Sequence, residues 1–234
     1  MTIWAISDLH LSHANPRRLA PLPPRWNNHV ERMRNLWSGC VAPRDLVLIP
    51  GDLSLATNHR DVQPDLDWLH ALPGRKVLSP GNHDVWWNKL EPVRRILRSS
   101  MYAVDGDAIE IDGVIVCGAR ACAPSEDQAA ASLSGLGSAL TLACGLRTST
   151  QPIYVLWHYP PFDRHGTPTD AARLMIDARV TACAFGHIHQ LGQWSTAAQH
   201  IQEGIPFRCV AADALGFRPL KLNNGDILNY STPR

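Results

Sequence analysis

The sequence predicts an α/β fold in which strand–helix units come first and short strands follow. Apolar runs at residues 3–6, 46–49 and 76–78 are typical of short buried strands, and segments with helical spacing lie between them. From residue 101 onward the pattern changes to short strands broken by Asp-Gly pairs, which are strong hairpin signals. A chain of 234 residues, 45% hydrophobic and 18% charged, is expected to form one globular domain over residues 1–234.

The first part of the chain is expected to alternate strands with helices. The predicted strands are residues 2–7, 45–50 and 76–78, and the predicted helices are residues 28–40, 61–72 and 85–99. Residues 11–26 form a proline-rich loop that excludes a regular helix. Pro64 is tolerated because it falls in the first turn of its helix.

The second part is expected to contain more strands than helices. The predicted strands are residues 102–105, 107–111, 114–118, 153–157, 181–185, 207–212 and 219–222, with a hairpin turn at residues 223–226. The first three should pair antiparallel, because Asp105-Gly106 and Asp112-Gly113 separate them. Helices are predicted at residues 126–144 and 169–178.

Charge and cysteine content bound the class of protein. The formal net charge is +1, so the overall charge of the chain does not indicate binding to nucleic acid or to a membrane surface. The six cysteines form no C-x-x-C pair and are expected to be buried thiols in a reducing compartment. We expect a cytoplasmic protein without a membrane segment, because the amino terminus leads directly into a strand and no apolar run looks long enough to span a bilayer. The oligomeric state stays open.

Polar side chains capable of binding metal follow five of the predicted strands. Asp8 and His10 are two residues apart, so they share one side of an extended segment. The full set is Asp8, His10, Asp52, Asn82, His83, His158, His187 and His189. One histidine at a strand end is usually an ordinary polar group, but an ordered set is hard to obtain by chance. Imidazole and carboxylate together suit zinc, iron or manganese. The set suits two ions that share one carboxylate and keep open positions for water and substrate.

The ordered set resembles the motifs of the calcineurin-like metallophosphoesterase superfamily. The matching segments are Asp8-Leu9-His10, Gly51-Asp52, Gly81-Asn82-His83-Asp84, His158 and Gly186-His187-Ile188-His189. The wider runs around residues 6–12, 81–87 and 117–120 are similar to a bacterial branch of predicted phosphohydrolases. The resemblance implies a four-layer β-sandwich of two mixed sheets flanked by helices. The strand count agrees with this fold but would not predict it unaided.

The resemblance also implies a role for each residue of the set. Asp8, His10 and His189 correspond to ligands of a first metal ion, and Asn82, His158 and His187 to ligands of a second. Asp52 corresponds to the bridge between them. His83 corresponds to a residue that reaches the phosphoryl or leaving oxygen without binding metal. Asp84 then orients His83 or holds the turn, and a helix N-cap is an equally good interpretation.

A reaction follows from these roles. Two divalent ions, Mn, Fe or Zn, would lower the pKa of a bound water, so that a metal-bound hydroxide attacks a phosphomonoester or phosphodiester. The ions would also neutralise the phosphoryl oxygens, on which charge builds. Asp52 and His83 are therefore the predicted catalytic residues, and His83 as an imidazolium would donate a proton to the departing oxygen.

Several residues outside the motifs have two interpretations each. Arg120 either reaches the substrate phosphate or caps a sheet edge. Trp86 and Trp87 either wall the pocket and stack on a base or are buried against the sheet. Arg17, Arg18 and Arg25 either line the pocket mouth or lie on an ordinary solvated loop. His165 either contacts the substrate or is an ordinary exposed loop histidine. Residues 126–144 form a buried helix, a dimer contact or a flexible lid.

The competing functions differ in partner and in metal content. The favoured partner is a small-molecule phosphate ester. A nuclease is disfavoured because it usually needs a basic track, which a net charge of +1 does not indicate. A pyrophosphatase of lipid precursors is disfavoured because members of that branch commonly carry arginine in the position of His83. A scaffold that keeps this fold without metals would have lost some of the metal ligands. All seven predicted ligands, the set above without His83, are present. Metal analysis distinguishes the scaffold from the enzyme.

Overall fold

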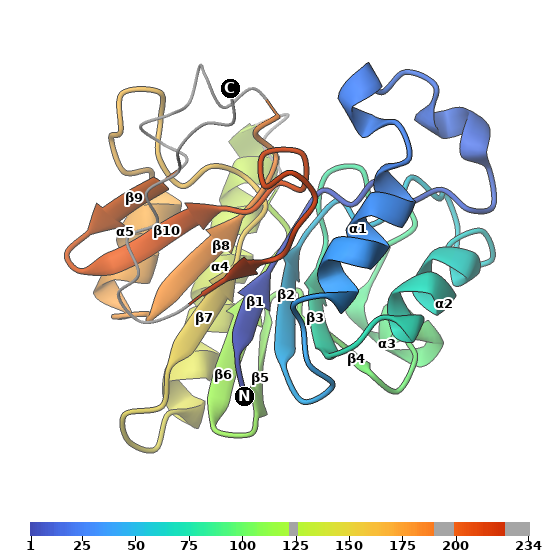
Figure 1. Cartoon of the computed structure of the whole chain (residues 1–234). Helices are drawn as coiled ribbons and strands as arrows, with labels where there is room; N and C mark the ends of the chain where they lie inside the picture. Colours follow the sequence, from blue (N-terminus) through green and yellow to red (C-terminus); the bar gives the residue numbers. More distant parts are fainter. Residues whose placement is uncertain (122–125, 190–198, 223–234) are drawn as a thin grey trace.

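Two β-sheets face each other, and helices cover the outer face of each sheet (Figure 1). The structure, a computed structural model, describes residues 1–121, 126–189 and 199–222. The order of layers is helices, first sheet, second sheet, helices. The predicted fold of two mixed sheets flanked by helices is therefore confirmed.

The first sheet is formed by the amino-terminal strands and one late strand. Its order is β11 (Leu220–Lys221), β1 (Ile3–Ala5), β2 (Leu46–Pro50), β3 (Arg75–Ser79) and β4 (Met101–Ala103). Strands β1 to β4 run parallel, and β11 is antiparallel to β1. Its outer face is covered by α1 (His29–Ser38), α2 (Gln63–Ala71) and α3 (Leu90–Ile96). Two 3-10 turns, η1 (Pro16–Leu19) and η2 (Pro24–Trp26), replace a helix in the proline-rich loop, as expected.

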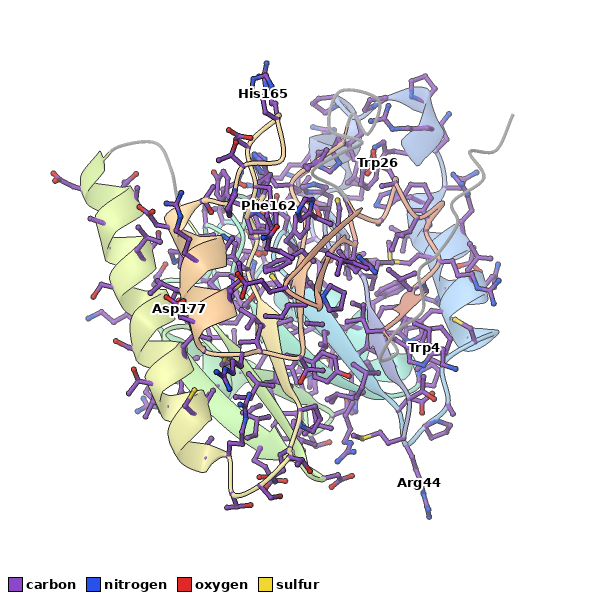
Figure 2. All side chains as sticks on the ribbon, turned by 90° about the vertical axis from the view of Figure 1, so that its left-hand side faces the viewer. Trp4, Trp26, Arg44, Phe162, His165 and Asp177 are labelled. Atoms are coloured by element: carbon purple, nitrogen blue, oxygen red, sulfur yellow. The ribbon has the colours of Figure 1, made fainter. Side chains whose placement is uncertain are left out.

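The second sheet has parallel strands in its centre and antiparallel strands at its edges. Its order is β5 (Asp107–Ile111), β6 (Val114–Gly118), β7 (Ile153–Leu156), β8 (Ala182–Phe185), β10 (Ile205–Cys209) and β9 (Gln199–Gln202). Strands β6, β7, β8 and β10 are parallel. Helices α4 (Glu126–Leu146) and α5 (Asp170–Asp177) lie side by side on its outer face (Figure 2).

Residues alternate along each central strand between the inter-sheet core and a helix-covered face. On β2, Leu46 and Leu48 point between the sheets, while Val47 and Ile49 pack with the residues beneath α1 and α2. All five residues of β2 are buried, as are all four of β7. Parallel strands covered on both faces give such continuous apolar runs. The apolar runs that predicted buried strands therefore have this physical origin.

The helix predicted over residues 85–99 is too long. The structure has a turn after the Gly81-Asn82-His83-Asp84 segment, and α3 begins only at Leu90. Trp87 N donates to the Asp84 carbonyl, 2.9 Å away, which closes the turn. The Asp84 carboxylate accepts hydrogen bonds from the amides of Leu53, Ser54 and Gly81. Asp84 is thus not a helix N-cap: its side chain holds two neighbouring loops together.

The prediction of an antiparallel sheet over residues 102–118 is half right. Strands β5 and β6 form the expected hairpin around Asp112-Gly113. Strand β4 instead pairs parallel with β3 in the first sheet, so Asp105-Gly106 carries the chain from one sheet to the other. Strand β9 was not predicted. The turn predicted at residues 223–226 lies outside the described residues.

Helix α4 corrects two expectations. It spans 21 residues, and by length and composition alone its Asp127–Leu146 stretch could cross a membrane, contrary to the expectation that no run is long enough. In the fold its buried residues Leu136, Ala139, Leu140 and Ala143 join the core of the second sheet. Cys144 on the same helix is exposed, so not all cysteines are buried thiols.

Candidate metal centre

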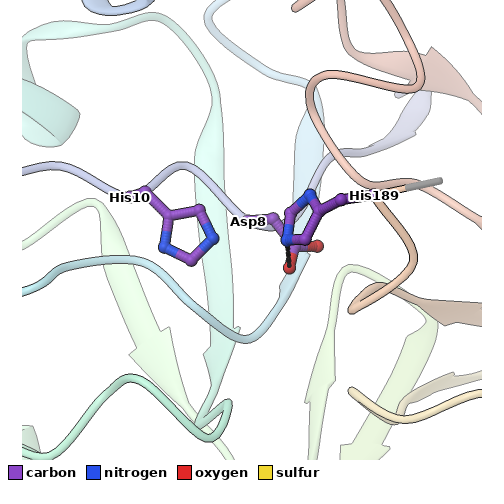
Figure 3. Close-up of side chains that lie close together, drawn as sticks. All are labelled: Asp8, His10 and His189. Carbon is purple, nitrogen blue, oxygen red and sulfur yellow. Dashed lines mark ion pairs between the residues drawn. The ribbon is translucent and has the colours of Figure 1, made fainter. Parts of the chain in front are cut away.

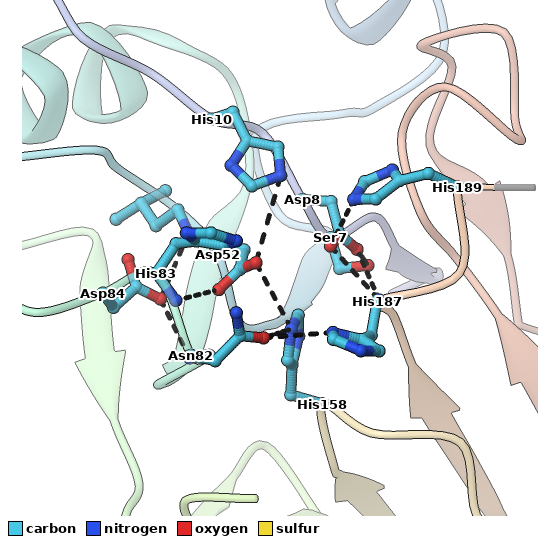
Figure 4. A network of polar contacts seen from close by, with 12 residues as sticks. Ser7, Asp8, His10, Asp52, Asn82, His83, Asp84, His158, His187 and His189 are labelled. Atoms are coloured by element: carbon cyan, nitrogen blue, oxygen red, sulfur yellow. Dashed lines mark hydrogen bonds and ion pairs between the residues drawn. The ribbon is translucent and has the colours of Figure 1, made fainter. Parts of the chain in front are cut away.

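The predicted donors meet where the carboxyl ends of both sheets come together (Figure 4). The first sheet supplies residues that follow β1, β2 and β3, and the second sheet supplies residues that follow β7 and β8. The sheets are joined at this point, because Ser7 after β1 forms a parallel bridge with Ala211 after β10. The structure brings together Asp8, His10, Asp52, Asn82, His158, His187 and His189.

Four of these residues have backbones in the left-handed region. The φ angles are 56° at Asp8, 44° at His10, 54° at Asp52 and 69° at His187. Such conformations cost about 1–3 kcal/mol each and persist where the surroundings impose them. Asp8 and His10 therefore do not lie on an extended segment, as the sequence suggested. The chain turns sharply at the strand ends, and these turns aim the side chains at one another.

Two glycines permit the close approach of the strand ends. A Cβ atom on Gly81 would overlap the Asp52 carboxylate, and one on Gly186 would overlap Asp8 Oδ2 and Ser7 Oγ. The amide of His187, next to Gly186, is 3.1 Å from each Asp8 carboxylate oxygen. The glycine of each motif thus makes room for a carboxylate supplied by another strand.

One group of donors surrounds the amide oxygen of Asn82. Asn82 Oδ1 lies 2.9 Å from His158 Nε2 and 3.0 Å from His187 Nδ1. His158 Nε2 also lies 3.3 Å from Asp52 Oδ2. On its other side, His158 Nδ1 is 2.9 Å from the Pro50 carbonyl, which can only accept a hydrogen bond. The proton of neutral His158 therefore belongs on Nδ1, and the lone pair of Nε2 faces two oxygen acceptors.

The other group consists of Asp8, His10 and His189 (Figure 3). His189 Nε2 is 3.5 Å from Asp8 Oδ1. One nitrogen or carboxylate oxygen from each of the three lies within 4.8 Å of those from the other two. His10 Nε2 lies 3.9 Å from Asp52 Oδ2, so Asp52 borders both groups.

Burial and neighbouring charges shift the pKa values of these groups in opposite directions. Burial alone would raise the pKa of Asp52, but attraction and a hydrogen bond from His158 hold it well below its usual range. Burial would lower the pKa of His158, yet Asp52 raises it to about 9. Burial dominates at two other donors: it raises the pKa of Asp8 to about 6 and lowers that of His10 to about 3.

The donor set fits divalent transition-metal ions. In neutral His158 the Nε2 lone pair faces the Asn82 Oδ1 atom at 2.9 Å, so a cation bound here would replace the proton that the imidazolium otherwise supplies. Imidazole nitrogens with carboxylate and amide oxygens are the ligands expected for zinc, iron or manganese. Asp8, His10 and His189 would hold one ion, Asn82, His158 and His187 the other, and Asp52 would lie between them.

His83 and Asp84 differ from the donors. His83 is exposed, and its ring lies 5.4 Å from that of His10, centroid to centroid, at the edge of the site. Its backbone amide donates to Asp52 Oδ1 at 2.8 Å. The Asp84 carboxylate is occupied by backbone amides and by Trp86 Nε1. Asp84 therefore holds the turn, the second role that the resemblance allowed.

Arg120 and the two tryptophans lie apart from the donor cluster. The Arg120 guanidinium donates to the Trp87 carbonyl, and its Nη2 lies 3.8 Å from Asp105 Oδ2. Its role in binding phosphate stays a prediction. Trp86 and Trp87 are 0% and 2% exposed, so the idea that they stack on a base is wrong and the burial interpretation is confirmed.

The loop residues for which the sequence left two interpretations have different surroundings in the structure. Arg17 is exposed, and Arg18 donates to the Leu55 carbonyl. Arg25 reaches a side chain next to the site, as described below. His165 lies at the tip of a projecting loop (Figure 2).

Sequence reasoning missed two residues beside the cluster, Asp213 and Trp26. Asp213 Oδ1 lies 3.0 Å from His189 Nδ1. The Trp26 ring, 4% exposed, packs edge-on against His10 and His189 at centroid distances of 5.5 and 5.8 Å. Asp213 directly follows the run predicted as a strand at residues 207–212. The signal that marked the other donors, a carboxylate after an apolar strand, was therefore present.

Together, the two facing sheets and the cluster at their shared edge define a metal-dependent phosphoester hydrolase. The sequence pattern of the calcineurin-like phosphoesterases matches residues 1–191. The chain belongs to the calcineurin-like phosphoesterase family.

A sequence relative and solved structures are also similar to this chain. Over 93 residues the chain is 27% identical to the acyl-carrier-protein phosphodiesterase PptH of Mycobacterium tuberculosis, a match spanning 40% of this chain and 24% of that protein. The crystal structure of phosphopantetheinyl hydrolase (PptH) from Mycobacterium tuberculosis superposes with a TM-score of 0.61 at 13% identity, covering 99% of this chain and 98% of the other. The crystal structure of TT1561 from Thermus thermophilus gives 0.57 at 15% identity, with 95% and 98% covered. These structures share the fold.

Proposed function

We propose that this chain is a dinuclear phosphoesterase that hydrolyses a phosphodiester or phosphomonoester of a small molecule. The observation that carries the proposal is that Asp52 lies within 4 Å of a histidine from each of two groups of donors. Asp8 also offers a ligand atom within 4.8 Å of those of Asp52 and His158. Asp8, His10 and His189 form one group, and Asn82, His158 and His187 form the other. Each group mixes donors from both sheets.

Two divalent ions held there would activate water and neutralise the phosphoryl oxygens during an in-line displacement. The protein's own residues do the rest. Asp52 contributes its negative charge to both ion sites, because it lies within 4 Å of a histidine from each group. Exposed His83, beside His10, donates a hydrogen bond or proton to the oxygen that leaves. The turn held by Asp84 keeps Asn82 and His83 in place.

A diester is the favoured substrate within this class. The relative from Mycobacterium tuberculosis is named as a phosphodiesterase, and its resemblance to this chain supports the same kind of bond here. The net charge of +1 does not favour a long nucleic-acid track. We propose a small ester or a phosphodiester-linked group on a carrier as the substrate.

The test compares p-nitrophenyl phosphate with bis-p-nitrophenyl phosphate, using protein loaded with manganese. We expect turnover of the diester that stops when a chelator is added and returns with manganese. The matched control is Asp67→Asn, which breaks the exposed Arg98–Asp67 ion pair away from the site and should retain full activity. Turnover of neither ester by protein carrying two ions would contradict the proposed substrate class.

A further inference from the structure

A buried carboxylate outside the predicted donor set connects the group of Asp8, His10 and His189 to the proline-rich loop. Asp213, with a side chain 2% exposed, accepts from Arg25 Nε at its Oδ2 atom over 3.0 Å. Its Oδ1 atom lies 3.0 Å from His189 Nδ1. Arg25 Nη2 also donates to the His189 backbone carbonyl at 3.1 Å. Three segments distant in sequence therefore meet at one carboxylate.

This contact determines which ring nitrogen of His189 carries the proton and which carries the lone pair. An ionised carboxylate only accepts hydrogen bonds, so the proton of a neutral His189 must lie on Nδ1. Nε2 then carries the lone pair, and this atom is the one 3.5 Å from Asp8 Oδ1 (Figure 3). Asp213 thus selects the tautomer that a metal ligand requires at this position.

The surroundings also fix the orientation of the ring. Trp26 packs edge-on against His189, and the backbone carbonyl of His189 is held by Arg25. His10 in the same group differs, because its Nδ1 atom is buried and has no hydrogen-bond partner within the described part of the chain. The orientation of His189 is therefore specified by a charged partner, while that of His10 depends on packing.

We propose that Asp213, neutralised by Arg25, is a positioning residue that holds His189 as a ligand of the first metal ion. The inference rests on the proposed function, since it presupposes an ion at Asp8, His10 and His189. Carboxylates that bind the far nitrogen of a ligating histidine orient the ring and increase its basicity, and their loss typically costs 10–100-fold in metal affinity.

The experiment measures the two dissociation constants of Mn²⁺ by calorimetric titration of the metal-free full chain. For Asp213→Ala we expect one constant to rise 10–100-fold and the other to change less than about 3-fold. Asp213→Asn should fall between this variant and the wild type, because its amide oxygen still accepts from Nδ1 but carries no charge. Asp67→Ala, which removes an exposed aspartate paired with Arg98 Nε, is the matched control and should leave both constants unchanged.

The outcomes separate positioning from a merely structural role. If Asp213 only anchors its loop, Asp213→Asn and Asp213→Ala will lower the unfolding temperature of the metal-free chain but leave both constants at their wild-type values. That result would overturn the inference while leaving the proposed function intact. Wild-type protein that binds no Mn²⁺ would instead overturn the proposed function, and this inference with it.

Discussion

Asp52 is the residue at which the two groups of donors meet. Its Oδ2 atom lies 3.3 Å from His158 Nε2 and 3.9 Å from His10 Nε2, and its Oδ1 atom accepts the amide of His83. It is also 1% exposed, with a left-handed backbone. A carboxylate in this position supplies charge to both proposed ion sites, and the Asp8 carboxylate lies close to donors of both groups as well.

Asp52→Asn should therefore remove most of the activity and much of the bound metal. The amide has the same shape but no charge, so both ions lose a shared anionic ligand. Metal content and kcat at saturating manganese check this expectation, with Asp67→Asn as the charge-matched control on the surface. Substantial turnover by Asp52→Asn under these conditions would exclude the bridging role.

His83→Gln should lower kcat without loss of either ion, because its exposed ring is at the edge of the donor cluster. The decrease should be roughly 10²-fold or more on an alkyl ester, whose leaving oxygen needs a proton. It should be smaller on a p-nitrophenyl ester, whose leaving group is already stable as an anion. Equal decreases on both esters would rule out proton donation, and lost metal would make His83 a ligand.

Lys76 offers a test of burial far from the donors. It is 0% exposed on β3, its ammonium donates to the Leu72 carbonyl, and burial lowers its pKa from 10.5 to about 8. Between pH 8 and 10.5 the unfolded chain holds more protons at this residue than the folded chain does. Its contribution to the free energy of unfolding is therefore unfavourable below pH 8 and is relieved as the pH rises through this window.

Lys76→Met should raise the free energy of unfolding at pH 7 by up to about 3 kcal/mol, the equivalent of this pKa difference. The gain over the wild type should shrink toward pH 10.5. Urea unfolding of both proteins at several pH values measures it, and thiols that titrate in both cancel in the comparison. A pH-independent difference would show that the charge of Lys76 is not the cause.

At the scale of single residues, the sequence predicted which side chains meet in the cluster but not what surrounds them. Asp84 could be an N-cap or a turn anchor, because the sequence does not reveal that loop residues 53 and 54 approach its carboxylate. Asp213 was missed because its partner, His189, is 24 residues away. Donors can be predicted from strand-end position, whereas hydrogen-bond partners depend on the tertiary fold.

At the scale of elements, the turns after the strands carry the site. Strands β1 and β2 are parallel neighbours, and the loops that follow them remain hydrogen-bonded, with Asp8 N donating to the Gly51 carbonyl and His10 N to the Asp52 carbonyl. The second sheet has a similar contact, because Gly186 N donates to the His158 carbonyl. Backbone bonds therefore fix the relative positions of the donors.

Gly186→Ala tests how tightly these turns approach one another. The added methyl group would overlap Asp8 Oδ2 and Ser7 Oγ, so the carboxylate must move. We expect loss of ions from the Asp8 group and roughly a 10²-fold fall in kcat, the usual effect of a displacement of about 1 Å.

The matched control for Gly186→Ala is Gly137→Ala on α4. No atom lies within 4 Å of a Cβ built on Gly137, and alanine in a helix interior should stabilise the fold by about 0.5–1 kcal/mol. Metal content, kcat and unfolding temperature of both variants are the measurements. Wild-type metal content and kcat in Gly186→Ala would show that the turn can relax.

Element prediction succeeded where apolar periodicity was clear and failed where a turn was held by side chains. The buried strands β2, β3 and β7 matched their apolar runs to within one or two residues. The helix expected from residue 85 failed because Trp86 and Trp87 are buried within a turn that Asp84 stabilises. The hairpin predicted at Asp105-Gly106 was wrong, because an Asp-Gly pair also suits a connection that crosses from one sheet to the other.

At the scale of the whole molecule, neither sheet alone contains a complete donor group. The Asp8 group takes His189 from the second sheet, and the His158 group takes Asn82 from the first. The sequence alone predicted alternating strands and helices but not two facing sheets, because no local pattern specifies which strands share a sheet. The resemblance to a known family supplied that arrangement, and the structure confirms it.

If the shared edge of the two sheets binds two ions, as proposed, the ratio of metal to protein in the purified chain should be two. The chain would be loaded with manganese, freed of excess metal and analysed by inductively coupled plasma mass spectrometry. We expect two equivalents in the wild type and a clear loss in Asp52→Asn. Less than one equivalent in the wild type would contradict the proposal and would favour a scaffold that keeps the fold without the metals.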